Sequence, residues 1–133
     1  MQTGSCLCGA VTYEIAGELP PVQLCHCAMC RRASGAGFAT NMAVATADFR
    51  VTAGADRLKS YASSPGKERL FCADCGSPII SRTDAAPGMV RVRAGTLADP
   101  ADTRPAFHFH VASKASWLPI TDDLPQYPGD RPK

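Results

Sequence analysis

Three thiols lie within six residues of this chain, in the run Cys25-His26-Cys27-x-x-Cys30. Thiolates this close repel one another unless they share a cation or are oxidised, and cysteines so near in sequence form only strained disulfides. Soft thiolate ligands select zinc, Cu(I) or iron–sulfur centres. The run therefore predicts a metal site, and we expect any chemistry of the protein to take place there.

Four further cysteines form two more close pairs, Cys6-x-Cys8 and Cys72-x-x-Cys75. The total of seven is odd, which counts against a complete disulfide framework. The N-terminus lacks the basic and apolar regions of a signal peptide. We therefore expect a cytoplasmic protein whose cysteines stay reduced. All seven are interpreted as metal ligands, with buried inert cysteines as the alternative.

The length of 133 residues predicts a single domain, 1–133. A content of 45% hydrophobic and 20% charged residues is typical of a folded globular protein. The net charge of +2 gives no electrostatic reason to expect nucleic acid or a membrane surface as a partner. No stretch approaches the roughly 20 apolar residues that span a bilayer. The sequence leaves the oligomeric state open.

Short strands with little helix are the expected architecture. Eleven prolines and eleven glycines leave little room for long helices. Val11, Tyr13 and Ile15 alternate with polar residues, as in a half-buried strand. Similar short runs between turn signals predict an all-β sandwich or a partly open barrel. We expect strands over 11–15, 22–25, 38–44, 49–52, 58–63, 68–71, 78–81, 89–94 and 107–111, a turn or two of helix over 27–34, and an irregular tail over 118–133.

Seven thiolates divide into four and three, because structural zinc has four protein ligands whereas catalytic zinc keeps one position open. Gly9 follows the first outer pair and Gly76 follows the second. A glycine after the second ligand lets the backbone turn tightly and direct N–H groups at sulfur. These features predict a closed structural zinc site built from Cys6, Cys8, Cys72 and Cys75.

Cys25, Cys27 and Cys30 remain as an open three-thiolate site, for which zinc is a more economical choice than an iron–sulfur cluster. Side chains alternate along an extended segment, so His26 is expected to point away from the metal, as a pocket residue rather than a fourth ligand. Arg31 could offset the negative charge of the site together with Arg32, or the two could form a solvated surface pair.

Two histidines and a tryptophan near the C-terminus have a structural interpretation, which leaves the chemical roles of the histidines open. His108 and His110 share one face of the last predicted strand and are interpreted as a solvent-facing pair. Trp117 is expected to anchor the tail to the body of the protein.

Three motifs in order resemble the glutathione-dependent formaldehyde-activating (GFA) family. They are Ser5-Cys6-Leu7-Cys8-Gly9-Ala10-Val11, then Cys25-His26-Cys27-x-x-Cys30-Arg31-x-x-Ser34-Gly35, then Arg69-x-Phe71-Cys72-x-x-Cys75-Gly76-Ser77. The run from Pro105 and His108 to Leu124-Pro125-Gln126-Tyr127 is similar as well. The resemblance spans about residues 4–128. It implies a mainly β, Mss4-like fold of short antiparallel strands in small sheets, with a structural zinc on the four outer cysteines and a second zinc on the central three.

The activity implied by the resemblance is that of a carbon–sulfur lyase, which joins glutathione and formaldehyde as S-(hydroxymethyl)glutathione. A thiol entering the open position of the second zinc would lose its proton and could attack an aldehyde held against it. Arg31, Arg32, Lys67 or Arg69 could hold a carboxylate of the thiol carrier. Three thiolates make the second zinc a weak Lewis acid, and we expect it to be the more labile of the two.

Other functions are weighed against this one. A non-enzymatic zinc module that binds a partner or senses metal or thiol would show an exposed apolar patch in place of a pocket. A zinc-ribbon nucleic-acid binder would need a basic stripe, which the sequence lacks. A methionine sulfoxide reductase is disfavoured because every cysteine falls in a ligand-like cluster and none is left as a lone nucleophile.

Overall fold

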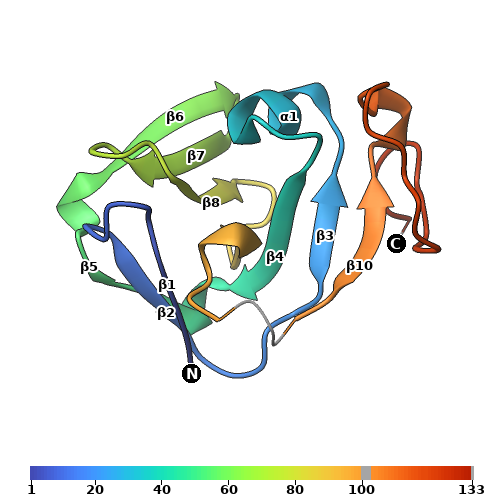
Figure 1. Cartoon of the computed structure of the whole chain (residues 1–133). Coiled ribbons are helices and arrows are strands. Elements are labelled where there is room, and N and C mark those ends of the chain that lie inside the picture. The colour runs from blue at the N-terminus through green and yellow to red at the C-terminus, as the bar shows by residue number, and fades with distance from the viewer. Residues whose placement is uncertain (100–102, 133) are drawn as a thin grey trace.

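The computed structural model describes residues 1–99 and 103–132 of the chain. Within these residues the chain forms ten strands and one α-helix, which lies at one end of the large sheet (Figure 1). The strands are β1 (Gln2–Ser5), β2 (Thr12–Ile15), β3 (Val22–Cys25), β4 (Ala39–Ala45), β5 (Phe49–Ala53), β6 (Leu58–Ser64), β7 (Lys67–Cys72), β8 (Pro78–Thr83), β9 (Met89–Arg93) and β10 (Pro105–Phe109), and the helix is α1 (Ala28–Ser34). Short 3-10 turns cover Thr46–Asp48, Ala55–Arg57, Ala94–Thr96 and Val111–Ser113.

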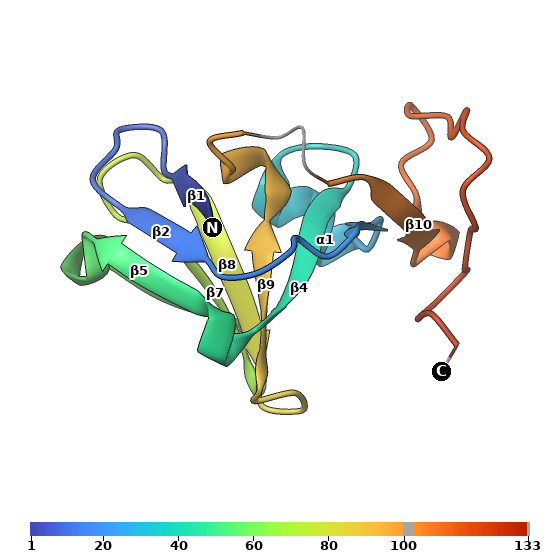
Figure 2. The ribbon, with the colours of Figure 1, turned by 90° about the horizontal axis from the view of Figure 1, so that it is seen from below.

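The strands form two sheets. The smaller has the order β1-β2-β5 and the larger the order β10-β3-β4-β9-β8-β7-β6. All neighbours are antiparallel except β10 and β3. Figures 1 and 2 show the small sheet beside the curved larger one, with the tail beyond β10. The predicted mainly β fold of small sheets with little helix is confirmed.

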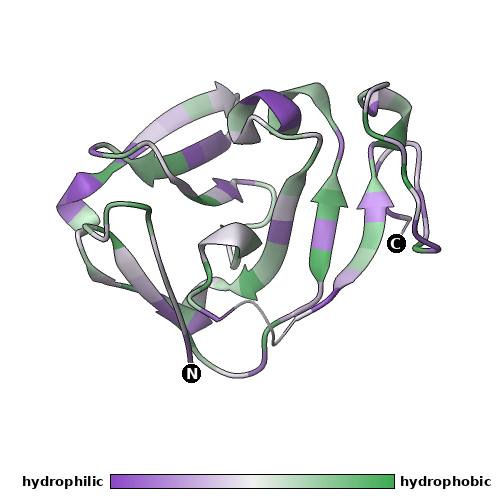
Figure 3. Ribbon diagram, viewed as in Figure 1, coloured by the Kyte–Doolittle hydropathy of each residue, from purple (hydrophilic) through white to green (hydrophobic). Residues whose placement is uncertain are grey.

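The core lies between the two sheets, and the alternation predicted for the strands places it there. Tyr13 and Ile15 of β2 are each 1% exposed and pack in one cluster with Met42 of β4 and Ile79 of β8. Hydrophobic and hydrophilic residues alternate visibly along β3 (Figure 3). In β9 the buried register begins at Val90, so the opposite face carries the arginines of that strand.

Helix α1 begins and ends where the sequence predicts. Cys27 is its N-cap, and the Cys27 sulfur accepts a hydrogen bond from the Cys30 backbone N–H at 3.2 Å. Gly35 ends the helix with φ at 68°, a left-handed conformation that glycine adopts without strain. The end of β3 and the first turn of α1 together carry the three central cysteines.

The solvent-facing interpretation of His108 is wrong. This residue is 2% exposed, because β10 pairs with β3 on one edge and its backbone bonds the tail on the other. The His108 N–H donates to the Pro125 carbonyl and the Tyr127 N–H donates to the His108 carbonyl, each at 2.9 Å. His110 lies beyond the strand with φ at 55°, and its Nε2 lies 2.9 Å from a carboxylate oxygen of Asp130, so the two histidines do not share a face.

The anchoring role predicted for Trp117 is also wrong, since its exposed fraction is 67%. The tail is held by the backbone bonds to β10 and by Lys114, whose ammonium donates to the carbonyls of Ala115 and Leu118 at 2.9 Å each. The described part of the tail, 118–132, contains no helix or strand, as predicted. In the part of the chain that the structure describes, no helix is long and apolar enough to cross a membrane.

Candidate functional site

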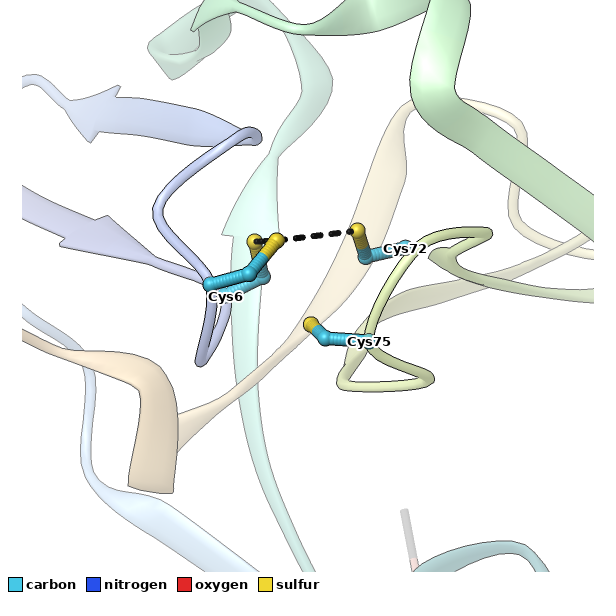
Figure 4. Close-up of side chains that lie close together, drawn as sticks. Cys6, Cys72 and Cys75 are labelled. Atoms are coloured by element: carbon cyan, nitrogen blue, oxygen red, sulfur yellow. Dashed lines mark hydrogen bonds between the residues drawn. The ribbon is translucent and has the colours of Figure 1, made fainter.

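The four outer cysteines meet between the two sheets. Cys6 and Cys8 lie in the loop after β1, Cys72 ends β7, and Cys75 lies in the turn before β8. Their sulfurs all lie within 4.8 Å of one another, and those of Cys6, Cys72 and Cys75 point toward a common centre in Figure 4. The separation is 3.6 Å from Cys6 to Cys8 and 3.8 Å from Cys8 to Cys72. Tetrahedral zinc with Zn–S bonds of about 2.3 Å places its sulfurs about 3.8 Å apart, so the cluster fits such an ion.

Both cysteine turns use glycine as the sequence predicts. Gly9 has φ at 81° and Gly76 has φ at 80°. The turn after Cys75 adds a group that the sequence reasoning missed, the Ser77 hydroxyl, which lies 3.3 Å from the Cys75 sulfur. Hydrogen bonding to Ser77 lowers the pKa of Cys75 to about 5. This thiol is therefore predisposed to the thiolate form that binds metal.

The three central cysteines, which we call the trio, lie together at the end of β3 and the start of α1. Their sulfurs all lie within 4.8 Å of one another. Cys25 and Cys30 are buried, whereas Cys27 is half-buried. No other histidine, cysteine or carboxylate of the described residues joins the group, so a metal ion held here would keep a position for a further ligand.

The surroundings of the trio shift the pKa values of Cys25 and Cys30 in opposite directions. Hydrogen bonds from Cys25 and Cys27, and then from Arg69, hold the pKa of Cys30 below its ordinary value. The Arg69 Nη2 donates to the Cys30 sulfur at 3.9 Å. Hydrogen bonds with Cys27 and Cys30, together with burial, raise the pKa of Cys25. Of these two thiols, Cys30 is the one that its surroundings favour as a thiolate.

The cation beside the trio comes from a distant strand. Arg31 and Arg32 follow Cys30 on α1, but Arg32 is exposed and neither lines the cavity that opens at the trio. Arg69 of β7, 39 positions from Cys30 in sequence, lies there. Lys67, on the same strand, is half-buried.

A cavity of about 600 Å³ opens beside Cys30. Its walls are mostly apolar and include Phe38, Leu70, Phe71, Pro78 and Ile80. The turn of the four-cysteine cluster contributes Gly76 and Ser77 to the wall, so both clusters border this space.

Two buried arginines, Arg69 and Arg93, also line the cavity, and each is 8% exposed. The Arg93 Nη1 donates to the side-chain oxygen of Asn41. Burial, and then repulsion from Arg69, lowers the pKa of Arg93 to about 10, which leaves it cationic at neutral pH. The sequence reasoning missed Arg93. The sequence did hold a signal for it: Arg93 alternates with the buried valines of β9, a strand inside the large sheet, so its side chain lies on the other face of that sheet.

A chain of three side chains links the trio to the tail. His26 is fully buried, and its Nε2 lies 2.7 Å from the His108 Nδ1. The His108 Nε2 lies 2.9 Å from a carboxylate oxygen of Asp122, and hydrogen bonding to His108 lowers the pKa of Asp122. The ionised carboxylate accepts a hydrogen bond from the His108 Nε2–H, and in a neutral His108 ring the Nδ1 then accepts a hydrogen bond from the His26 Nε2–H. The expected place of His26, off the metal and inside the protein, agrees with this contact.

Several known proteins are similar to this chain. The profile of the family described as glutathione-dependent formaldehyde-activating enzyme matches residues 1–113. A Halomonas elongata protein, provisionally named as such an enzyme, is 32% identical over 126 residues, which cover 88% of this chain and 79% of that protein. A Schizosaccharomyces pombe protein named as an uncharacterized lyase is 33% identical over 76 residues, covering 57% of this chain and 53% of the other.

A crystal structure of a Rhodobacter sphaeroides protein superposes with a TM-score of 0.63 at 28% identity. The superposition covers 77% of this chain and 97% of that one. The Halomonas and Rhodobacter proteins are thus similar to this chain over most of its length. The Halomonas protein is named as an enzyme and the Schizosaccharomyces protein as a lyase. The chain belongs to the glutathione-dependent formaldehyde-activating enzyme family.

Proposed function

We propose that this protein is a zinc-dependent enzyme of the carbon–sulfur lyase type, which forms or cleaves the adduct of a thiol such as glutathione with an aldehyde. The observation that carries the proposal is the trio, of which Cys30 lines a cavity with two buried arginines. Family membership supports the thiol and the aldehyde as substrates. The domain would be the whole chain, 1–133, and a reducing compartment such as the cytoplasm would keep its seven cysteines as thiols.

The two clusters would have different roles. Cys6, Cys8, Cys72 and Cys75 would hold a structural zinc between the two sheets. Cys25, Cys27 and Cys30 would hold the second zinc, which, when bound, lowers the pKa of a thiol in its remaining position. Arg31, next to Cys30 on α1, would add positive charge to this end of the helix.

The side chains around the trio would hold both reactants. Arg69 would stabilise the Cys30 thiolate and, with Arg93, bind a carboxylate of the thiol carrier. The apolar walls would exclude water from the aldehyde. In the forward direction a bond forms between sulfur and the carbonyl carbon, the C=O double bond becomes a single bond, and the thiol proton ends on that oxygen. No electrons are exchanged with another reactant.

Exchange NMR of glutathione with formaldehyde, with and without zinc-loaded protein, tests the proposal. The protein should accelerate exchange, and Cys27→Ser should abolish the acceleration. Met29→Ala is the matched control, because Met29 lies on the same helix, is 44% exposed and has no thiol. Absence of acceleration by the wild type, or its persistence in Cys27→Ser, would refute the lyase assignment.

The alternative of a non-enzymatic zinc module receives less support. That function calls for an exposed apolar patch at the trio, where this chain has a cavity with buried charge instead.

A further inference from the structure

The ligand chemistry of the cavity beside the trio follows from three features: the unused donor of one arginine, the balance of charge, and the character of the walls. Arg69 is the central residue. Its Nε donates to the Ser63 hydroxyl at 3.0 Å and its Nη2 donates to the Cys30 sulfur. Its Nη1 is buried and has no partner among the described residues. A buried guanidinium without a carboxylate partner is costly, and Arg69 lines the cavity, so an anionic ligand bound there would offset this cost.

The charge of the site points to an anion. Arg69 and Arg93 bring two positive charges into a space where each is 8% exposed, and neither forms an ion pair with a carboxylate of the described residues. The side-chain partner of Arg93, Asn41, is neutral. Three thiolates on one zinc ion carry a net charge of about −1, which offsets one guanidinium. The second guanidinium, together with the half-buried Lys67 ammonium near it, leaves positive charge for a ligand to neutralise.

The walls point to an apolar body. The residues that line the cavity include two phenylalanines, a leucine, an isoleucine, a proline and a tyrosine, and no aspartate or glutamate of the described residues is among them. A free ammonium group placed here would face two arginines and no carboxylate. Glutathione carries such an ammonium group, two carboxylates and two peptide bonds, all of which need polar partners when they leave water.

We propose that the cavity binds an organic carboxylate with an apolar body, whose carboxylate is held by Arg69 and Arg93 and whose body packs on Phe38, Phe71 and Ile80. This inference rests on the proposed function only in assigning that ligand as the thiol carrier or its adduct. A planar carboxylate matches the arginine fork, and the cavity of about 600 Å³ is large enough for an aryl or medium-length alkyl group.

Calorimetric titration of the zinc-loaded protein with three probes tests this inference. The probes are 4-phenylbutyrate, its neutral analogue 4-phenylbutanamide, and S-methylglutathione, whose blocked sulfur cannot compete for metal. We expect 4-phenylbutyrate to bind at least about tenfold more tightly than the amide, because a charge-assisted hydrogen bond is lost with the carboxylate. We also expect it to bind more tightly than S-methylglutathione.

Arg69→Gln should weaken 4-phenylbutyrate binding by about tenfold or more and leave amide binding unchanged. Arg82→Gln is the matched control, since Arg82 lies on β8 outside the cavity and pairs with Glu68 on the surface. A zinc count on each variant shows whether the change at Arg69 disturbs Cys30. If Arg69→Gln lowers the zinc content, Arg93→Gln is used in its place. The comparison of the three probes on the wild-type protein tests the inference without any variant.

Equal binding of the acid and the amide would overturn the role of the arginines. Tighter binding of S-methylglutathione would overturn the apolar-body assignment, and failure of every probe to bind would overturn both. None of the probes carries a free thiol or an aldehyde. Loss of probe binding therefore refutes this inference without touching the lyase proposal, whereas absent exchange activity with intact probe binding refutes glutathione as the thiol of the lyase proposal and leaves this inference standing.

Discussion

Removing one thiol from each cluster should have unequal effects on stability. Cys72 is fully buried and Cys30 is 2% exposed, so replacing either by serine places a hydroxyl in an equally buried position. The pair is therefore matched in the cost of burial, and any difference in unfolding free energy reports on what each cluster connects.

The connection made by the four-cysteine cluster is much longer. Cys8 and Cys72 are 64 positions apart, whereas the trio spans six residues. In the loop-closure treatment used for cross-links, a loop of the first size constrains the unfolded chain by about 4 kcal/mol and one of six residues by about 2 kcal/mol. The cluster also joins the β1–β2 loop of the small sheet to the β7–β8 turn of the large one. Cys72→Ser should thus cost at least about 2 kcal/mol more than Cys30→Ser.

Thermal melts with a metal count on both variants measure this. For a chain of this length 2 kcal/mol corresponds to a further drop in Tm of about 8 °C. Cys30→Ser should remain folded with the second metal lost, whereas Cys72→Ser should unfold or aggregate. Chelation of the wild type should remove the trio's metal first while the fold persists. Equal destabilisation by the two substitutions would refute the division into a structural and a functional site.

Three further substitutions probe other parts of the structure. Gly76→Ala places a side chain at φ 80° and should cost about 1–2 kcal/mol in urea unfolding, whereas Gly88→Ala, with open space and no positive φ, should cost little. Asn41→Ala leaves the buried Arg93 without its acceptor and should cost about 1.5–3 kcal/mol by the same measurement, and an unchanged midpoint would contradict the contact. The pKa of Asp122 is below its ordinary 3.8, so the unfolded state binds more protons there, and the stability it contributes is complete above that pH and lost as the pH falls through the lowered value. Urea melts of Asp122→Asn should therefore differ most from the wild type at neutral pH and converge with it in acid, and a constant difference would contradict this reasoning.

Local signals in the sequence were sufficient for most of the elements. Alternation located β2 and β9, and the helix over 27–34 was bounded by a cysteine cap and by Gly35. These predictions succeed because each depends on residues that are close in the chain. Strand β1, which shows no alternation of apolar residues, was not predicted. The division of the cysteines into four and three used their spacing, the glycines that follow two of them and the number of ligands that each kind of zinc site takes, and the sulfurs do lie in these two groups.

The errors concern contacts between distant segments. The alternation of residues 107–110 predicted a strand with its histidines on a solvent-exposed face. Instead the tail forms backbone hydrogen bonds along the free edge of β10, and His108 is buried. The charges next to Cys30 in sequence suggested that Arg31 and Arg32 either offset the charge of the trio or form a surface pair, with Arg69 as one of four candidates for binding a carboxylate. Neither Arg31 nor Arg32 lines the cavity, whereas Arg69 lines it and donates to the Cys30 sulfur. Neither result depends on local sequence, because both are set by which strands pair.

The β7–β8 hairpin connects the two clusters physically, and this explains why a structural cluster would matter to chemistry elsewhere. Cys72 ends β7, the strand that carries Arg69 and Phe71 into the cavity. The turn that holds Cys75 continues directly into Ser77, which forms part of the same wall. Metal bound by the four cysteines would fix the end of β7 against the loop after β1, and with it the position of the Arg69 guanidinium relative to the Cys30 sulfur. The geometry of the trio's surroundings is therefore set partly by residues that never contact the ligand.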